Sequence, residues 1–153
     1  MSELKRTILY QAHLDAGATM VDFGGWDMPI QYPEGIIAEH LYCRRHCGIF
    51  DVSHMGRIDV EGPDQVAFLQ HVLSSNVLAL DLNQAQYCII PDANGYAIDD
   101  AYLYRFEEGK YFLVINAGNI DKDWAHLMNE AKNFDVKLTN VSDKYAAIAV
   151  QGP

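Results

Sequence analysis

The chain has 153 residues, half of them hydrophobic, which suits a globular protein with a buried core. Its 11 Lys and Arg residues against 21 Asp and Glu residues give a formal charge of −10, and such a surface repels the phosphate backbone of nucleic acids. No apolar run reaches the roughly 18 residues of a membrane helix, residues 1–17 mix both charge signs and lack the apolar block of a signal peptide, and three cysteines build no disulfide framework. We therefore expect a cytoplasmic protein that binds neither nucleic acid nor membrane.

The N-terminal third of the chain mixes helical and extended patterns. Apolar residues at helical spacing predict a helix over residues 3–15. Residues 18–32 combine aromatic side chains with a Gly pair and a Pro, which indicates a strand or an ordered loop. A Pro at the start, basic residues at the end and Gly48 beyond them predict a helix over residues 33–47.

The middle of the chain is predicted to form a strand, a helix and then a meander. Residues 49–62 alternate like a strand, and Pro63 opens a helix that ends near Ser74. Three extended runs separated by turn-forming residues then predict an antiparallel meander. The runs are residues 87–90, 96–105 and 111–116.

The C-terminal part carries a helical pattern over 119–132 and two extended runs, 136–139 and 145–150. The last run is apolar at nearly every position, which is typical of an inner strand with neighbours on both sides. Because Gly-Pro usually marks a turn to something further on, the ending Gln-Gly-Pro predicts the N-terminal piece of a longer protein. Helices and strands mix without regular alternation, so the predicted class is α+β, with mixed or antiparallel sheets and packed helices.

Two adjacent aspartates, Asp99 and Asp100, interrupt the apolar strand YAIDDAYLYR. Side chains alternate along a strand, so Asp100 shares a face with tyrosines and an isoleucine, whereas Asp99 shares the other face with alanines and a leucine. Partial removal from water on the aromatic face suits Asp100 for proton handling or for holding a cation. Asp99 is expected to have a structural role or to lie at the surface. The alternative for both aspartates is that they cap the end of the strand or pair with surface cations.

The helix predicted over 33–47 carries four possible metal ligands, which are His40, Cys43, His46 and Cys47. Three of them fall on one helical stripe, and thiolate and imidazole are zinc ligands. However, a structural zinc site needs four converging ligands, and free cysteines commonly act as small buried hydrophobes. We therefore expect no metal here and keep a zinc-binding helix as an alternative.

Five stretches occur in order along the chain: MVDFGGWDMPIQY, GIFDVSHMGRIDVEGP, NGYAIDDAYLYR, VINAGNIDKDW and AVQGP. Together they resemble the glycine cleavage system T protein family, the aminomethyltransferases. The resemblance runs from about residue 6 to the end of the chain.

The resemblance implies an enzyme of glycine catabolism and one-carbon metabolism. The family passes a one-carbon unit from the aminomethyl-dihydrolipoyl arm of the H protein to tetrahydrofolate. The products are 5,10-methylenetetrahydrofolate, ammonia and the reduced lipoyl arm. The implied partner is the lipoylated H protein, the co-substrate is tetrahydrofolate, and no metal is needed.

The resemblance also implies roles for individual residues. The functional aspartate of the family corresponds to Asp100, the residue that the strand-face argument also favours. Tyr87 corresponds to a tyrosine beside the pterin. Met55, Tyr104 and Asn116 match positions that line the folate cavity.

The sequence departs from the family pattern in two places. Tyr96 follows Gly95 where most relatives have a second Gly, which changes the turn before the aspartates. The family chain also continues well beyond the last motif and folds as three domains around a folate channel. We thus expect one α+β subdomain from residues 1–50 and 117–153, a second from 51–116 that carries the catalytic aspartate, and little or no turnover by the isolated chain.

Two alternatives of function remain from the sequence. The first is a folate-dependent demethylase or oxidase domain of the same superfamily, with a different one-carbon donor. The second is a non-catalytic folate-binding or partner-docking module. Loss of turnover on replacing Asp100 separates the catalytic interpretations from the second alternative.

Overall fold

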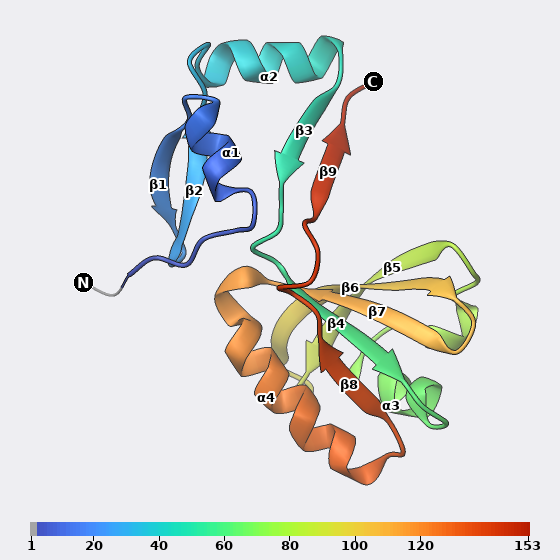
Figure 1. Cartoon of the computed structure of the whole chain (residues 1–153). Helices are drawn as coiled ribbons and strands as arrows, with labels where there is room; N and C mark the ends of the chain where they lie inside the picture. Colours follow the sequence, from blue (N-terminus) through green and yellow to red (C-terminus); the bar gives the residue numbers. More distant parts are fainter. Residues whose placement is uncertain (1–2) are drawn as a thin grey trace. The chain divides into compact units, whose positions relative to one another are not determined.

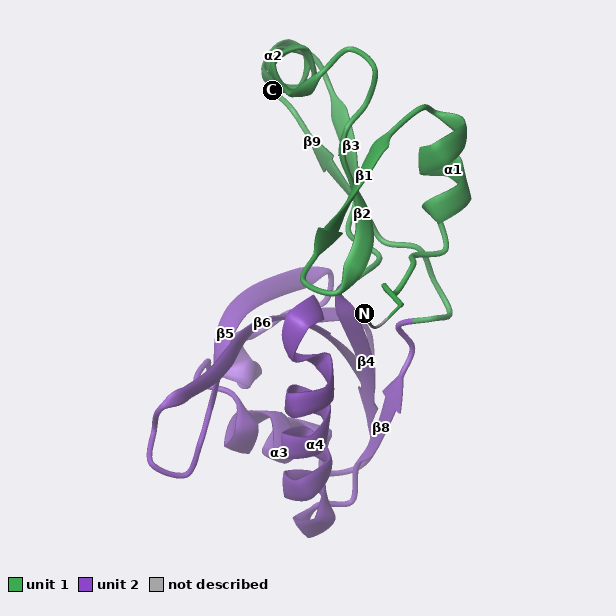
Figure 2. Ribbon diagram, turned by 90° about the vertical axis from the view of Figure 1, so that its left-hand side faces the viewer, with its two compact units in different colours: residues 1–54, 143–153 green, residues 55–142 purple. Residues whose placement is uncertain are grey.

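A computed structural model describes residues 3–153 as two compact units. The first comprises the chain up to His54 together with Asp143–Pro153, and the second comprises Met55–Ser142 (Figure 2). Within residues 3–153, no helix is both long enough and apolar enough to cross a membrane.

The second unit is built on a five-stranded antiparallel sheet in the order β5-β6-β7-β4-β8 (Figure 1). Two helices and three short 3₁₀ helices, η1 to η3, complete it. The strands are β4 (Gly56–Glu61), β5 (Gln84–Pro91), β6 (Ala97–Glu107), β7 (Lys110–Ile115) and β8 (Lys137–Asn140). The helices are α3 (Gln65–Val72), α4 (Ile120–Glu130), η1 (Val77–Ala79), η2 (Ala117–Asn119) and η3 (Ala131–Asn133).

The core of this unit follows from the alternation of apolar residues in the meander. Along β7, Tyr111, Leu113 and Ile115 are buried, and the residues between them are not. Phe68 and Leu69 of α3, with other apolar residues of α3 and α4, join these side chains in one hydrophobic cluster. Both helices therefore cover the same face of the sheet, and the other face is uncovered along β5 and β6, where Tyr87, Tyr102 and Phe106 are exposed.

Gly62, between β4 and α3, occupies a position that a larger residue does not tolerate. Its φ is +130°, and a Cβ there would lie 2.6 Å from the backbone oxygen of Asp135. We expect Gly62→Ala to lower the free energy of unfolding by about 3 kcal/mol, since backbone strain and a backbone clash add. Gly109→Ala is the matched control, because φ is +74° there but nothing lies within 4 Å, and it should cost only about 1 kcal/mol. Urea unfolding measures both, and equal losses for the two variants would contradict the role of the clash.

The first unit contains the hairpin of β1 (Thr19–Phe23) and β2 (Trp26–Gln31), with α1 (Tyr10–Asp15) beside it. Gly24 and Gly25 form its turn, and both have positive φ, +58° and +87°, as the commonest two-residue hairpin turn requires. The other elements are α2 (Ile36–Arg45) and the antiparallel pair of β3 (Gly48–Asp51) with β9 (Ile148–Gln151). No residue of α2 is buried.

A buried polar network joins α1 to β2 and β3. The ring of His13 lies 2.8 Å from the Tyr32 hydroxyl through Nδ1 and 2.9 Å from Asp51 Oδ2 through Nε2. The Thr7 hydroxyl donates to the same Asp51 oxygen at 2.7 Å. Burial opposes ionisation of Asp51, but its hydrogen bonds to Ser53, His13 and Thr7 outweigh that effect and lower its pKa.

Several predicted elements differ from the structure. The strand expected over 49–62 is two strands, because residues 52–55 form a turn in which Asp51 Oδ1 accepts the backbone N–H of Ser53 at 2.8 Å. The helix expected over 3–15 is confined to Tyr10–Asp15, since Lys5 makes a β-bridge with Trp26. The inner-strand prediction for 145–150 is wrong for the described residues, in which β9 pairs with β3 alone and leaves Val150 exposed.

The unit boundary also differs from the expected division, which grouped residues 117–142 with the N-terminal part. In the structure, α4 and β8 belong to the second unit. β8 pairs with β4 at the edge of the five-stranded sheet, and Leu127 of α4 is buried in that sheet's core. These contacts assign residues 117–142 to the second unit.

Candidate active site

The two aspartates of β6 point to opposite faces of the sheet, as strand geometry dictates. Asp99 is paired with Ile90 and Asp100 with Ile89 of β5. The Asp99 face continues into the buried residues Ala101 and Leu103 beneath the helices, whereas the Asp100 face is the uncovered one. Asp99 is therefore a residue of the core side rather than of the surface.

Asn116, directly after β7, links the two carboxylates. Its Nδ2 donates to Asp99 Oδ1 and to Asp100 Oδ1, each at 3.0 Å, and lies 3.2 Å from the Asp100 carbonyl oxygen. One amide group thus holds both aspartates just beyond the end of β7. Its geometry fixes the orientation of the Asp100 carboxylate.

A third carboxyl, that of Asp123 on α4, lies behind Asp99. Asp123 is completely buried, at 0% exposure, and neither of its carboxyl oxygens has a hydrogen-bond donor among the described residues. Burial, followed by the Asp99 carboxylate, raises the pKa of Asp123 to about 7. Burial opposes ionisation of Asp99 as well, but neighbouring donor groups, Asn116 among them, lower the pKa of Asp99.

Tyr87 of β5 approaches Asp100 on the uncovered face. Partial desolvation and then the charge of Asp100 raise the pKa of the Tyr87 phenol. The Tyr87 ring is 52% exposed and packs edge-on against Tyr102, with ring centroids 5.7 Å apart. A carboxylate, a phenol and an amide thereby meet beside an open aromatic surface.

The other predicted site residues lie further from this cluster. Met55 directly precedes Gly56, which is paired with Ile115, so Met55 lies near the level of Asn116 on a neighbouring strand. Tyr104 shares the face of Asp100, but four residues along β6 place it roughly 13 Å away. It stacks instead on Phe106, at 5.3 Å between ring centroids.

The departure at Tyr96 is accommodated by the turn between β5 and β6. Gly95 has a φ of +84°, and Asp92 Oδ1 accepts the backbone N–H groups of Asn94 and Tyr96 at 2.8 and 2.9 Å. The Tyr96 side chain is exposed. A side chain at this position therefore does not disturb the aspartates that follow.

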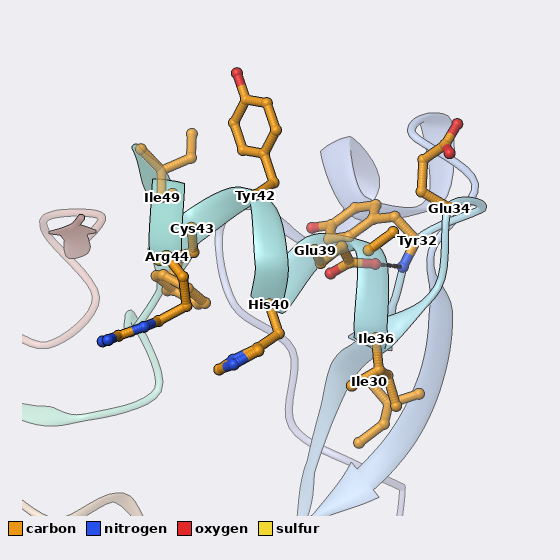
Figure 3. A pocket seen from close by; sticks show the side chains of 13 residues that line it. Ile30, Tyr32, Glu34, Ile36, Glu39, His40, Tyr42, Cys43, Arg44 and Ile49 are labelled. Atoms are coloured by element: carbon orange, nitrogen blue, oxygen red, sulfur yellow. Dashed lines mark hydrogen bonds between the residues drawn. The ribbon is translucent and has the colours of Figure 1, made fainter. Parts of the chain in front are cut away.

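A cavity of about 680 Å³ lies elsewhere, in the first unit (Figure 3). It is lined by α2 and neighbouring residues of β2 and β3, including His40 and Cys43. One of its carboxylates, Glu39, is already committed to the backbone N–H of Tyr32 at 2.6 Å. Figure 3 shows Tyr42 pointing away from His40, and no group of three His, Cys, Asp or Glu side chains converges for a metal within residues 3–153. The aspartates joined by Asn116 therefore remain the candidate active site.

The cluster around Asp100 suits reactions in which positive charge develops on a ligand. A half-exposed carboxylate held by an amide stabilises a nearby cation or accepts a proton, and it needs no reorganisation to do so. The neighbouring aromatic rings offer a flat surface to a planar ligand. The arrangement therefore fits a flat nitrogen heterocycle better than a phosphate or another anion.

Residues 9–153 match the family described as the GCVT N-terminal domain. The chain belongs to this family. An aminomethyltransferase of Deinococcus deserti is 54% identical over 98% of the chain, and one of Thermus thermophilus is 48% identical over the same share. The crystal structure of glycine cleavage system aminomethyltransferase T from Bartonella henselae superimposes with a TM-score of 0.92 at 39% identity over 98% of the chain.

The chain covers only part of each of these GCVT-family relatives. It spans 42% of the Deinococcus protein, 43% of the Thermus protein and 41% of the Bartonella chain. The family assignment and the α+β fold with antiparallel sheets and packed helices are thus confirmed.

Sequence reasoning missed one member of the cluster, Asp123. The signal was present, because Ile120, Trp124 and Leu127 mark the apolar stripe of α4 and Asp123 falls on that same stripe. A carboxyl on a buried helical stripe needs a partner within the core. Identifying that partner as Asp99 required the three-dimensional packing of α4 on β6.

Proposed function

We propose that this chain is the N-terminal part of an aminomethyltransferase of the glycine cleavage system. The enzyme moves the one-carbon unit of an aminomethyl-dihydrolipoyl H protein to tetrahydrofolate and releases ammonia. The observation that carries the proposal is the cluster of Asp100, Asn116 and Tyr87 on the uncovered sheet face of a GCVT-family chain. The names of the relatives support the same activity.

Asp100 is the catalytic carboxylate in this proposal. A folate nitrogen forms a bond to the aminomethyl carbon as the carbon–sulfur bond breaks, and the second folate nitrogen then displaces ammonia. The two protons from the folate nitrogens end on the lipoyl thiol and on ammonia. Asp100 stabilises the cationic character of the transferred carbon and nitrogen and directs these protons.

The remaining predicted residues form the folate side of the site. Tyr87 lies on the same sheet face as Asp100 and offers its exposed ring to a planar ligand. Asn116 orients the carboxylate, and Met55 and Tyr104 contribute more distant walls. Because the chain spans less than half of its relatives, we propose that further residues complete the folate site and that the isolated 153 residues turn over little or nothing.

The test uses a full-length aminomethyltransferase that contains this sequence. We expect ammonia release from aminomethyl-lipoyl H protein only when tetrahydrofolate is present, with one 5,10-methylenetetrahydrofolate formed per ammonia. Unlipoylated H protein is the control and should give no product. Turnover of N-methyl donors without any turnover of the lipoyl-bound aminomethyl group would instead assign a demethylase of the same superfamily.

A further inference from the structure

The buried side of the cluster contains two carboxyl groups with no conventional donor between them. Oδ2 of Asp99 and both carboxyl oxygens of Asp123 are buried, and no N–H or hydroxyl group of residues 3–153 donates to them. The Lys122 ammonium lies 2.7 Å from the Ile98 carbonyl oxygen and 4.0 Å from Asp123 Oδ1, which places the Asp123 carboxyl beside Asp99. Two carboxyl groups can satisfy each other only if one of them carries a proton.

The donors and the burial around each carboxyl group indicate which of the two carries the proton. Asp99 Oδ1 accepts a hydrogen bond from the Asn116 side chain at 3.0 Å, and neighbouring donor groups lower the pKa of Asp99 despite its burial. Asp123 is fully buried and has only Lys122 nearby, with Nζ at 4.0 Å from Oδ1. That ammonium group donates to the Ile98 carbonyl oxygen at 2.7 Å, so it is a weak counter-ion for Asp123. Donors favour the ionised form and burial favours the neutral form, so the proton belongs on Asp123.

We propose that Asp123 is a positioning residue that acts as a neutral acid and donates to Asp99, thereby fixing Asn116 and, through it, Asp100. This inference rests on the proposed function for its effect on turnover. The chain of contacts runs from α4 to Asp99, then to the Asn116 amide, and then to the carboxylate on the opposite face of the sheet.

Loss of the proton would put three negative groups into one cluster. The charged groups that act on Asp123 are Asp99 beside it, Lys122 from α4, and the more distant Asp100 on the other face of β6. Ionised Asp123 would repel Asp99 and compete for the donors that hold it. The raised pKa of Asp123, about 7, places this transition near neutral pH.

The test on turnover compares three substitutions in a full-length aminomethyltransferase that contains this sequence. Asp123→Asn keeps a neutral donor and should leave kcat within about threefold of wild type below pH 6.5, whereas Asp123→Leu removes the donor and should lower kcat by about 10- to 100-fold. KM for tetrahydrofolate should change little in both. Asp121→Asn, in the same helical turn but exposed, is the control. Above pH 7, wild type and Asp121→Asn should lose activity through a transition that Asp123→Asn lacks.

A second readout does not depend on activity. Carbon-13 NMR of the aspartate carboxyl groups should show one carboxyl still protonated at pH 5, and that signal should disappear in Asp123→Asn. The free energy of unfolding should also fall as pH rises from about 4 to 7, since the unfolded state then loses a proton that the folded state keeps. Asp123→Asn should lack this contribution.

The two readouts separate failure of the inference from failure of the proposed function. An Asp123 carboxyl that is ionised at pH 5 would overturn the inference, whatever the enzyme's activity. So would equal kcat losses in the Asn and Leu variants when both remain folded. A protonated Asp123 in a protein that transfers no aminomethyl group would leave the proton assignment intact and remove the proposed function.

Discussion

Asp100→Asn is expected to lower kcat of the full-length enzyme by at least roughly 100-fold. Asparagine keeps the shape of the side chain and an oxygen that can accept from Asn116, but it removes the negative charge that faces the developing cation. KM for tetrahydrofolate should change only a few-fold, because the lost interaction strengthens mainly in the transition state. Steady-state kinetics with saturating aminomethyl-lipoyl H protein measures the effect.

The Asp100 variant also needs a control for charge alone. Asp121→Asn removes one negative charge from an exposed position of the same unit and should keep kcat within a factor of about two. Thermal unfolding of both variants verifies that the fold is intact. Unchanged turnover in Asp100→Asn would favour the non-catalytic folate-binding module, the alternative that the sequence left open.

Phe68→Ala is expected to give the largest loss of stability, about 4 kcal/mol. Phe68 on α3 is completely buried and packs edge-on against Phe134, with ring centroids 5.7 Å apart. Removal of its ring leaves a cavity between the helices and the sheet, and the surrounding close-packed side chains refill such a cavity only in part. Urea unfolding, with the slope held common to both proteins, gives the difference in free energy of unfolding.

A phenylalanine on the opposite face of the same sheet provides the matched control. Phe106 is 58% exposed and stacks on Tyr104, so Phe106→Ala should cost less than about 1 kcal/mol. Equal losses at Phe68 and Phe106 would contradict the assignment of the core to the helix-covered face.

Most of the sheet unit was predictable because its signals are local. Turn residues at 91–95 and 107–109 separate alternating apolar runs, and the structure confirms the meander as β5, β6 and β7. The break between β3 and β4 was missed because a turn held by the Asp51 side chain interrupts a pattern that still alternates. The last strand was predicted to have neighbours on both sides, but β9 pairs only with β3 among the described residues. An apolar composition shows that a strand can be buried, whereas its pairing depends on which strands the chain provides.

In the candidate site too, the features with local sequence signals were predictable and those that depend on tertiary packing were not. Strand alternation separated Asp100 from Asp99, and the resemblance brought Tyr87 and Asn116 to the same cluster. The position of Asp99 on the core side depended on which sheet face the helices cover, and alternation alone does not reveal that. The inference that Asp123 carries a proton depended on the packing of α4 on β6, because this packing brings Asp123 beside Asp99, 24 positions away in the sequence.

The absence of any buried residue in α2 has a consequence for its dynamics. A ten-residue helix has too few hydrogen bonds to offset its nucleation cost in water, so its persistence depends on neighbours rather than on its own sequence. Ile37, at 76% exposure, and Tyr42 gain nothing from being helical unless another surface packs on them. In the chain by itself, α2 is therefore the first segment to fray, with amides that exchange with solvent long before those of the five-stranded sheet.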